Sequence, residues 1–256
     1  MAVRNAPLND DPRLKTHFAG EDQRRALTRD LFNDAAGGYD RAERLTAMGS
    51  GAWYRRDVLR RCGLRPGMQV LDVAAGTGLV TVEAHALVGA AGQVTALDPS
   101  PGMLAELRKK LDVQTVEAFA EDMPLPDAGM DFVSMGYALR HVADLDQAFG
   151  EYLRVLKPGG RVCIMEISRP ASRLGRALLR THIGVLVPAL ATLTRQRAEV
   201  GRLWAYYGDT IEAAVEPQRV LDALTRAGFT DVQCHVTFGV FREYVGRRPD
   251  STTPTA

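Results

Sequence analysis

The sequence predicts an α/β fold, a Rossmann-like doubly wound sheet of seven mostly parallel strands that ends in an antiparallel C-terminal hairpin. From Met68 onward, short apolar runs typical of strands alternate with helical stretches. A glycine turn at residues 76–78 directly follows the first of these runs. Near the C-terminus, two further apolar runs at 232–238 and 240–245 meet at Gly239. Alternating elements indicate parallel strands, and the closely spaced last pair indicates the hairpin.

The 256 residues are expected to form one domain with additions. Its expected parts are a helical N-terminal extension at 21–62, a cofactor-binding core at 63–167, a helical lid insertion at 168–212, and a C-terminal helix and hairpin at 213–246. In the extension, Arg25 and Arg29 are expected to face solvent, and the run Gly37-Gly38-Tyr39-Asp40 is expected to interrupt the helix. Tyr39 is interpreted either as a turn aromatic or as a lid residue over the cofactor.

Composition excludes several classes of function. Hydrophobic residues make up 46% and charged residues 25%, which are ordinary globular values. A net charge of +1 gives no reason to expect a nucleic-acid partner. The three cysteines are widely spaced and the five histidines scattered, so no metal site is expected. Without a secretory signal, and with Ile183–Leu193 too short to span a bilayer of about 30 Å, a cytoplasmic location is expected.

Within the core, the pattern assigns strands and helices in alternation. Strands are expected at 68–73, 93–98, 113–118, 131–136 and 160–167, and helices at 79–89, 101–110 and 144–156. Lys157-Pro158-Gly159-Gly160 is expected to be a turn that ends one helix and precedes the fifth strand. Carboxyl ends of parallel strands share one edge of the sheet, where such folds bind ligands.

The glycine turn favours a cationic cofactor. Asp72 lies inside the strand before the turn, where a dinucleotide fingerprint carries an apolar residue, and Thr81 replaces that fingerprint's third glycine. A sulfonium with an α-amino group gains from a nearby carboxylate. Asp98 follows 26 residues later (98 − 72 = 26), at the end of the second strand, where an acid accepts hydrogen bonds from ribose hydroxyls. S-adenosylmethionine is therefore preferred over a nicotinamide.

Two later stretches fit an adenosyl site. Ala120–Pro126 follows the third strand, where Asp122 is expected to take the adenine amino group and Met123 to pack on the ring. Alternatively, Asp122 only caps a turn. Ser134–Tyr137 ends the fourth strand beside the cofactor, and Ala138–Val142 follows it directly.

Together, these stretches resemble the UbiE/COQ5 family of S-adenosylmethionine-dependent C-methyltransferases of quinone biosynthesis. The matching pieces are Phe32 with Tyr39-Asp40, Val70–Gly78, Val94–Met103, Ala120–Pro126, Tyr137–Val142 and Leu153–Gly160. The glycine loop occurs in many methyltransferases, whereas Leu139-Arg140-x-Val142 is narrower. The cofactor contacts expected from the motifs and the resemblance are Tyr39, Asp72, Ala74, Gly76, Thr77, Gly78, Asp98, Pro99, Met103, Asp122, Met123 and Tyr137.

The resemblance implies methylation of carbon in a small hydrophobic phenolic or quinone-type acceptor, which requires loss of a phenolic proton. Arg140 stays protonated, so it would stabilise the phenolate or hold an activating water, unless it serves only a structural salt bridge. His141 stands where the family usually has asparagine. With a usual pKa of about 6.5 it could take the proton itself, or simply face solvent at a helix start.

The insertion at 168–212 matches the family poorly. It is interpreted either as a helical cap or as a substrate lid that rests on a membrane surface, with Tyr206 and Tyr207 expected at the acceptor. The expected partners are the aromatic acceptor, a membrane surface that the protein contacts peripherally, and a second copy of the chain in a homodimer. O- or N-methylation of a specialised metabolite stays open, as does a non-catalytic cofactor-binding role.

Overall fold

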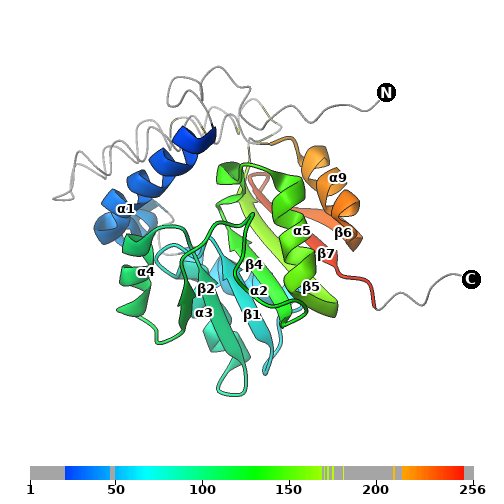
Figure 1. The fold of residues 1–256 in the computed structure, drawn as a ribbon. Coiled ribbons are helices and arrows are strands. Elements are labelled where there is room, and N and C mark those ends of the chain that lie inside the picture. The colour runs from blue at the N-terminus through cyan, green and yellow to red at the C-terminus, as the bar shows by residue number, and fades with distance from the viewer. Residues whose placement is uncertain are drawn as a thin grey trace, which may run out of the picture.

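The sheet has seven strands, and its order confirms the predicted fold class. The computed structural model describes residues 21–46, 50–168 and 215–250, with the single positions 170, 172, 175, 181 and 210. The strand order is β3-β2-β1-β4-β5-β7-β6 (Figure 1). The strands are β1 (Gln69–Val73), β2 (Gln93–Leu97), β3 (Gln114–Val116), β4 (Met130–Gly136), β5 (Leu156–Ile167), β6 (Thr230–Thr237) and β7 (Phe241–Arg247). Only β7 runs antiparallel to its neighbours, as the predicted hairpin requires.

Helices cover both faces of the sheet. They are α1 (Glu21–Thr46), α2 (Gly51–Arg61), α3 (Leu79–Val88), α4 (Pro101–Arg108), α5 (Leu145–Val155) and α9 (Pro217–Ala227), with a short 3-10 helix, η2 (Leu139–His141). Strand side chains alternate between the faces. On β5, Val162 and Ile164 join the cluster formed with α5 and α9, whereas Cys163 and Met165 join the cluster formed with α2 and α3. The core is therefore two apolar layers with the sheet between them.

The N-terminal helix α1 differs from the prediction, because it continues through Gly37 and Gly38 without a break. The chain leaves the helix after Thr46 instead, and α2 begins at Gly51. Two glycines in a helix interior cost about 1 kcal/mol each relative to alanine. Contacts on both sides of them offset this cost: the Gly102 amide donates to Asn33 Oδ1 at 2.7 Å, and Thr77 Oγ1 donates to Asp40 at 2.5 Å.

The predicted turn before the fifth strand lies within β5. Leu156 already pairs with Met130 of β4, and the register then shifts so that Arg161 pairs with Phe132. The intervening residues bulge, with Gly159 at φ +78°. Arg248, just beyond β7, pairs with this bulge, since its carbonyl accepts from the Gly159 amide and its amide donates to the Gly160 carbonyl. The glycines do bend the chain, as predicted. The bend lies within β5 and bonds to Arg248, so it belongs to the sheet and not to a separate turn.

Most of the lid insertion expected at 168–212, including Tyr206 and Tyr207, lies outside the described residues. Within the part of the chain that the structure does describe, no helix is both long and apolar enough to cross a membrane.

Candidate active site

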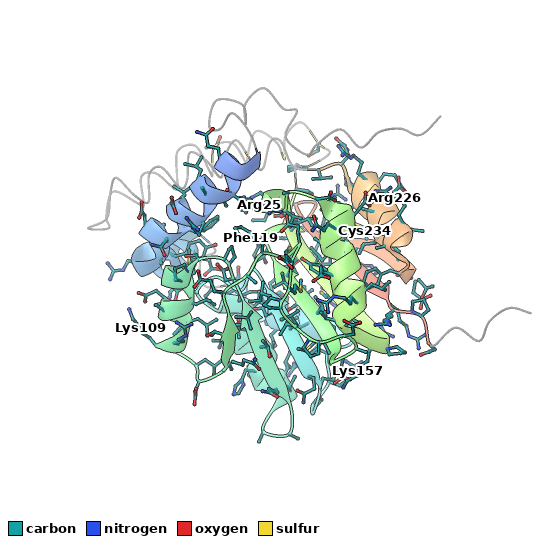
Figure 2. The ribbon with its side chains drawn as sticks, viewed as in Figure 1. Arg25, Lys109, Phe119, Lys157, Arg226 and Cys234 are labelled. Carbon is teal, nitrogen blue, oxygen red and sulfur yellow. The ribbon has the colours of Figure 1, made fainter. Side chains whose placement is uncertain are left out.

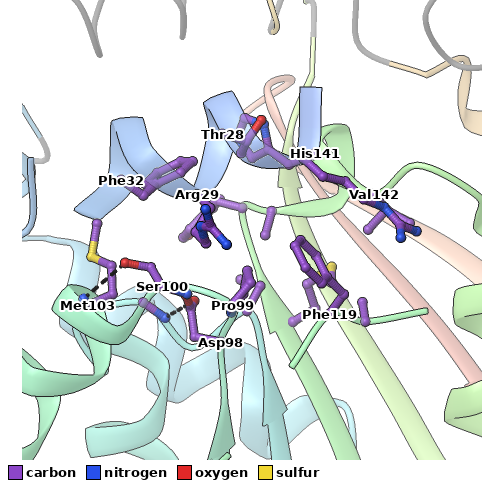
Figure 3. A pocket seen from close by; sticks show the side chains of 18 of the residues that line it. Thr28, Arg29, Phe32, Asp98, Pro99, Ser100, Met103, Phe119, His141 and Val142 are labelled. Atoms are coloured by element: carbon purple, nitrogen blue, oxygen red, sulfur yellow. Dashed lines mark hydrogen bonds between the residues drawn. The ribbon is translucent and has the colours of Figure 1, made fainter. Parts of the chain in front are cut away.

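A pocket lies at the carboxyl ends of β1, β2 and β4, in the edge of the sheet where the sequence predicts ligand binding. Helix α1 covers it from above, as the close view in Figure 3 shows. Its empty space, open mouth included, is about 820 Å³, which is in the size range of small-molecule sites. Eight of the predicted site residues line it: Tyr39, Ala74, Gly76, Asp98, Pro99, Met103, Tyr137 and His141.

The glycine turn leaves room for a ligand against its backbone. Gly76 has φ +56°, and a Cβ placed there would meet no atom within 4 Å. Because Gly76 also lines the pocket, that open space belongs to the ligand site. Gly78, at φ +86°, serves the fold instead, since a Cβ there would approach Leu107 to 2.8 Å. One glycine therefore permits ligand approach and the other permits close packing.

Asp98 presents a buried carboxylate at the end of β2. Its Oδ2 accepts from the Gly76 amide and its Oδ1 from the Ser100 amide, each at 2.8 Å. Burial raises the pKa of Asp98 to about 6, although the two amide bonds act in the opposite direction. The carboxylate lines the pocket, and each oxygen has further acceptor capacity. This geometry suits a ligand that donates two hydroxyl hydrogens.

Asp72 lies below the pocket and does not line it. It is fully buried, and its oxygens accept hydrogen bonds from Thr81 Oγ1 and Ser134 Oγ, both at 2.7 Å. Burial raises the pKa of Asp72 to about 6, against the lowering effect of these hydroxyls. Asp72 therefore ties β1 to α3 and β4, and its charge acts on the pocket from beneath.

Two non-glycine residues at the pocket have left-handed backbones. Ala74 after β1 has φ 52° and Tyr137 after β4 has φ 60°, and both line the pocket. Such conformations cost of order 1–3 kcal/mol and persist where the surroundings hold them. The Tyr137 amide is held by the Met165 carbonyl at 2.7 Å. The strain falls at the two strand ends that flank the ligand space.

After β3, the structure brings other residues to the pocket than those predicted. Asp122 is exposed and Met123 is buried in the core, and neither lines the pocket. Phe119, Ala120 and Glu121 line it instead. The chain turns sharply here, because the Asp122 amide donates to the Phe119 carbonyl at 3.2 Å, which directs Asp122 outward. The predicted stretch Ala120–Pro126 therefore located the right loop, but the residues that line the pocket lie one to three positions before Asp122.

Helix α1 forms the roof of the pocket. Its Thr28, Arg29 and Phe32 project toward the pocket (Figure 3), and Tyr39 of the same helix also lines it. Arg25 also lines the pocket, and 37% of its side chain is exposed, so the predicted solvent face of this helix holds only in part.

The roof is fastened to the glycine turn. Asp40 accepts from Thr77 Oγ1 at 2.5 Å and pairs with Lys110, whose ammonium also donates to the Thr77 carbonyl at 2.7 Å. Thr77 and Gly78 themselves do not line the pocket. The turn, the roof and α4 therefore form one connected unit.

Arg140 and His141 have different positions. The Arg140 Nη1 atom donates at 2.6 Å both to Glu166 Oε1 and to the Tyr137 carbonyl. Arg140 is 8% exposed and does not line the pocket. His141 does line it, and its ring meets Phe32 edge to face at 5.3 Å. The structure thus places His141 at the pocket and anchors Arg140 behind it through a buried ion pair.

The pocket fits S-adenosylmethionine. Asp98 presents a carboxylate where ribose hydroxyls would lie, Gly76 leaves open space over its backbone, and Asp72 supplies negative charge beneath. Within the described residues, neither carboxylate forms a salt bridge that would cancel its attraction for a sulfonium. The fold and this pocket define an S-adenosylmethionine-dependent methyltransferase of the class I type.

Comparison with known proteins gives the family. The profile of the ubiE/COQ5 methyltransferase family matches residues 19–248. A protein of Shewanella sediminis named ubiquinone/menaquinone biosynthesis C-methyltransferase UbiE is 31% identical, over 93% of this chain and 99% of its own length. A protein of the same name from Pseudomonas paraeruginosa is 32% identical, over 93% and 97%. The chain belongs to the ubiE/COQ5 methyltransferase family.

Solved structures agree on the fold. A SAM-dependent methyltransferase from Thermotoga maritima is similar with a TM-score of 0.61 at 20% identity, covering 86% of this chain and 99% of that one. Phosphoethanolamine N-methyltransferase 2 of Haemonchus contortus, solved with S-adenosylmethionine, has a TM-score of 0.56 at 16% identity, over 77% and 52%. These structures support the fold, and membership of the ubiE/COQ5 family makes the chain a methyltransferase with S-adenosylmethionine as its cofactor.

Proposed function

We propose that this enzyme transfers the methyl group to a ring carbon of a small hydrophobic phenolic or quinone-type acceptor. The observation that carries the proposal is His141 lining the pocket against Phe32, in a chain whose relatives are named C-methyltransferases of quinone biosynthesis. Phe32, Met135 and Val142 give the same part of the pocket an apolar character. A titratable group in apolar surroundings suits deprotonation of a phenol.

Bound S-adenosylmethionine supplies an electrophilic methyl group, and the chain's own residues supply alignment and proton removal. His141 accepts the phenolic proton, which makes the ring electron-rich. Arg140 is held in place by Glu166 and the Tyr137 carbonyl, and its fixed positive charge stabilises the phenolate or orients an activating water. At the cofactor, Asp98 would hold the ribose hydroxyls and Asp72 would favour the cation from below, while Tyr39, Ala74, Gly76, Pro99, Met103 and Tyr137 line the rest of the site.

The decisive experiment is an acceptor screen. Purified enzyme is incubated with S-adenosylmethionine and a panel of hydroquinones and phenols, and the mass and methylation position of each product are determined. A methyl group on ring carbon supports the proposal. Methylation of oxygen or nitrogen would replace it with the alternative chemistry, and binding of S-adenosylmethionine without turnover on any acceptor would favour a non-catalytic role.

Substitutions of Arg140 and His141 test the mechanism. Arg140→Ala is expected to lower turnover by about 10²-fold or more, on the scale of a lost positioned charge, with cofactor affinity close to wild type. Glu166→Gln is the matched control, because it disturbs the same ion pair while leaving the Arg140 charge. If both variants lose turnover equally, and in proportion to lost folded protein, the role of Arg140 is structural.

His141→Asn separates the two candidate bases. If His141 takes the proton, this variant loses activity and the pH–rate profile loses a titration near the usual histidine pKa. If water held by Arg140 takes it, His141→Asn is nearly silent. Membrane contact, a homodimer and acceptor contacts of Tyr206 and Tyr207 stay predictions from the sequence, and Tyr206→Ala or Tyr207→Ala is expected to change acceptor choice without changing cofactor affinity.

A further inference from the structure

The backbone of Tyr137 is held on both sides at the end of β4. Its left-handed conformation, at φ 60°, is uncommon and strained for an aromatic residue. Its amide donates to the Met165 carbonyl at 2.7 Å, and its carbonyl accepts from Arg140 Nη1 at 2.6 Å. The same Arg140 atom donates to Glu166 Oε1, also at 2.6 Å. Two consecutive residues of β5, Met165 and Glu166, therefore fix the direction in which the Tyr137 side chain leaves the backbone.

The ion pair behind Tyr137 is rigid and does not reach the ligand space. Glu166 is 4% exposed, and it accepts from the Ile167 amide at 2.8 Å and from the Arg140 amide at 3.2 Å. Arg140 does not line the pocket, whereas Tyr137 does. What the ion pair holds in the pocket is therefore Tyr137.

The Tyr137 side chain offers a hydrogen-bond donor to a ligand. Its hydroxyl has no hydrogen-bond partner among the described residues. Burial raises the pKa of this hydroxyl well above its usual value, and Arg55 of α2 acts in the opposite direction. Further neighbours add to the rise of the pKa, namely Glu43, Glu166 and Tyr39. The hydroxyl therefore keeps its proton at neutral pH.

Tyr137 lies at the end of the pocket where the acceptor is expected. Asp98 marks the ribose at the end of β2, and β1 separates β2 from β4 in the sheet. On the β3 side the lining includes Arg25 and Phe119, whose guanidinium carbon and ring centre lie 5.2 Å apart; Figure 2 shows both between α1 and the strand ends. On the β4 side it includes Tyr137 and His141. An acceptor that approaches from the β4 side therefore meets the two residues that can handle a phenolic oxygen.

We propose that the Tyr137 hydroxyl donates a hydrogen bond to the acceptor oxygen and thereby directs the methyl group to ring carbon, and that the Arg140–Glu166 pair acts by positioning Tyr137. The proton of the acceptor oxygen passes to the base, which is His141 in the proposed function. The hydroxyl then stabilises the negative charge left on that oxygen. An oxygen whose lone pair is engaged in a hydrogen bond is a poorer nucleophile, so the electron-rich ring carbon reacts instead. The inference rests on the proposed function and deepens it, because it gives the phenolate a partner inside the pocket.

The product ratio of Tyr137→Phe tests the proposal. This variant keeps the ring and removes only the hydroxyl, and it is assayed on the phenol or hydroquinone that gives the most ring-methylated product in the acceptor screen. Ring methylation is expected to slow at least about tenfold, the scale of a lost hydrogen bond to a charged group, and the share of oxygen-methylated product to rise. The ratio of products does not depend on the amount of folded enzyme. Tyr244→Phe is the matched control, because it removes a hydroxyl from a buried tyrosine outside the pocket lining.

Binding of 4-nitrophenol gives a readout without turnover. Its phenol and phenolate absorb at different wavelengths, so absorbance reports the ionised fraction of the bound probe near neutral pH, with S-adenosylhomocysteine present. Wild type and Tyr244→Phe are expected to bind the probe in a more ionised form than it has in solution. In Tyr137→Phe the ratio of bound phenolate to bound phenol is expected to fall at least about tenfold. Affinity for S-adenosylhomocysteine stays within about twofold of wild type, because the hydroxyl serves the acceptor.

A double-mutant cycle tests the positioning role of Arg140. If Arg140 acts by holding Tyr137, the variant that combines Tyr137→Phe with Arg140→Ala loses no more ring methylation than the more damaging single substitution. Two independent roles would instead multiply the losses. Multiplied losses would therefore overturn the positioning role and return the phenolate contact to Arg140 itself.

The remaining outcomes separate this inference from the proposed function. An unchanged product ratio in Tyr137→Phe, or an unchanged ionised fraction of the bound probe, would overturn the role of the hydroxyl, as would a wild-type enzyme that takes up no ionised probe. Ring methylation by wild type would still support the proposed function in each of these cases. If wild type methylates no phenol or hydroquinone in the screen, the proposed function fails, and the role of Tyr137 fails with it.

Discussion

The sheet buries carboxylates in two regions, and their partners differ. Below the pocket, Asp72 and Asp98 accept hydrogen bonds from hydroxyls and backbone amides, and burial raises the pKa of each to about 6. In β7, Glu243 is equally buried but accepts from Arg61 Nη1 at 2.9 Å, from Tyr54 at 2.8 Å and from Thr237 at 2.8 Å.

The pKa values follow these partners. Burial alone would raise the pKa of Glu243, yet the bonds from Arg61, Tyr54 and Thr237 together hold it below its usual value. The folded chain itself thus supplies the cation, Arg61, that pairs with the Glu243 carboxylate. Asp72 and Asp98 have no cation partner among the described residues, so their negative charge is available to a cationic ligand. The structural acid Glu243 differs from the two acids proposed to serve the cofactor in having an arginine, Arg61, as its partner.

The largest expected effect is on the structural acid. Glu243→Ala leaves three donors without their acceptor and is expected to lower the free energy of unfolding by about 2–4 kcal/mol. The lower part of this range is expected, because Arg61 is 43% exposed and regains water. Urea unfolding measures the loss, and S-adenosylhomocysteine affinity of the folded fraction should change less than about twofold. A large affinity loss would mean that the two regions are not independent.

Asp98→Ala is expected to show the opposite pattern. Cofactor affinity falls by about 1.5–3 kcal/mol, roughly 10- to 150-fold, because hydrogen bonds to a charged group are lost. Stability changes by less than about 1 kcal/mol, since the Gly76 and Ser100 amides lose an acceptor while an unpaired buried charge is removed. Calorimetry and urea unfolding of the same preparation distinguish the patterns. A variant that binds normally would remove Asp98 from the site.

Lowering the pH removes the charge of the Asp98 carboxylate without a mutation. Protonation of Asp98 competes with ribose hydroxyls for the carboxylate, so affinity for S-adenosylhomocysteine is expected to fall as the pH drops through about 6. The expected loss is about tenfold between pH 7 and pH 5. Asp98→Asn should give a clearly flatter profile, because Asp72, whose pKa is also raised to about 6, still titrates there but does not contact the ligand. An equally steep profile in Asp98→Asn would assign the titration to another group.

The sequence predicted the pocket with Asp98 better than the pairing of Glu243 with Arg61. The doubly wound fold class, the glycine turn and Asp98 at the end of β2 follow from local pattern, because alternation and glycine positions are properties of short segments. Glu243 and Arg61 are 182 residues apart in the chain, so no local pattern relates them. Their pairing depends on α2 packing against the β7 side of the sheet, which only the fold provides.

The roof of the pocket was predicted less well for the same reason. Gly37 and Gly38 predicted a break in the helix, yet the contacts of Asn33 and Asp40 with α4 and the glycine turn hold α1 continuous. Arg25 was assigned to solvent because charged residues are usually exposed. Its actual partners, Phe119 and Glu121, follow a strand almost a hundred residues later. Likewise, Asp122 is exposed where the chain turns back after β3, with its amide bonded to the Phe119 carbonyl.

The smallest expected effect concerns Asp72, which acts on the ligand through its field and not by contact. Asp72→Asn keeps the shape of the side chain, and the Thr81 and Ser134 hydroxyls can still bond to it. Removing its charge should therefore weaken S-adenosylmethionine about threefold more than S-adenosylhomocysteine, because only the former carries the sulfonium charge. The free energy of unfolding at pH 7.5 should stay level or rise, since an ionised acid without a cation is costly to bury. Added salt should leave the ratio of the two affinities nearly unchanged, because a fully buried charge is poorly screened. Calorimetric titration with both ligands gives the ratio directly, and equal weakening would show that Asp72, like Glu243, serves the fold alone.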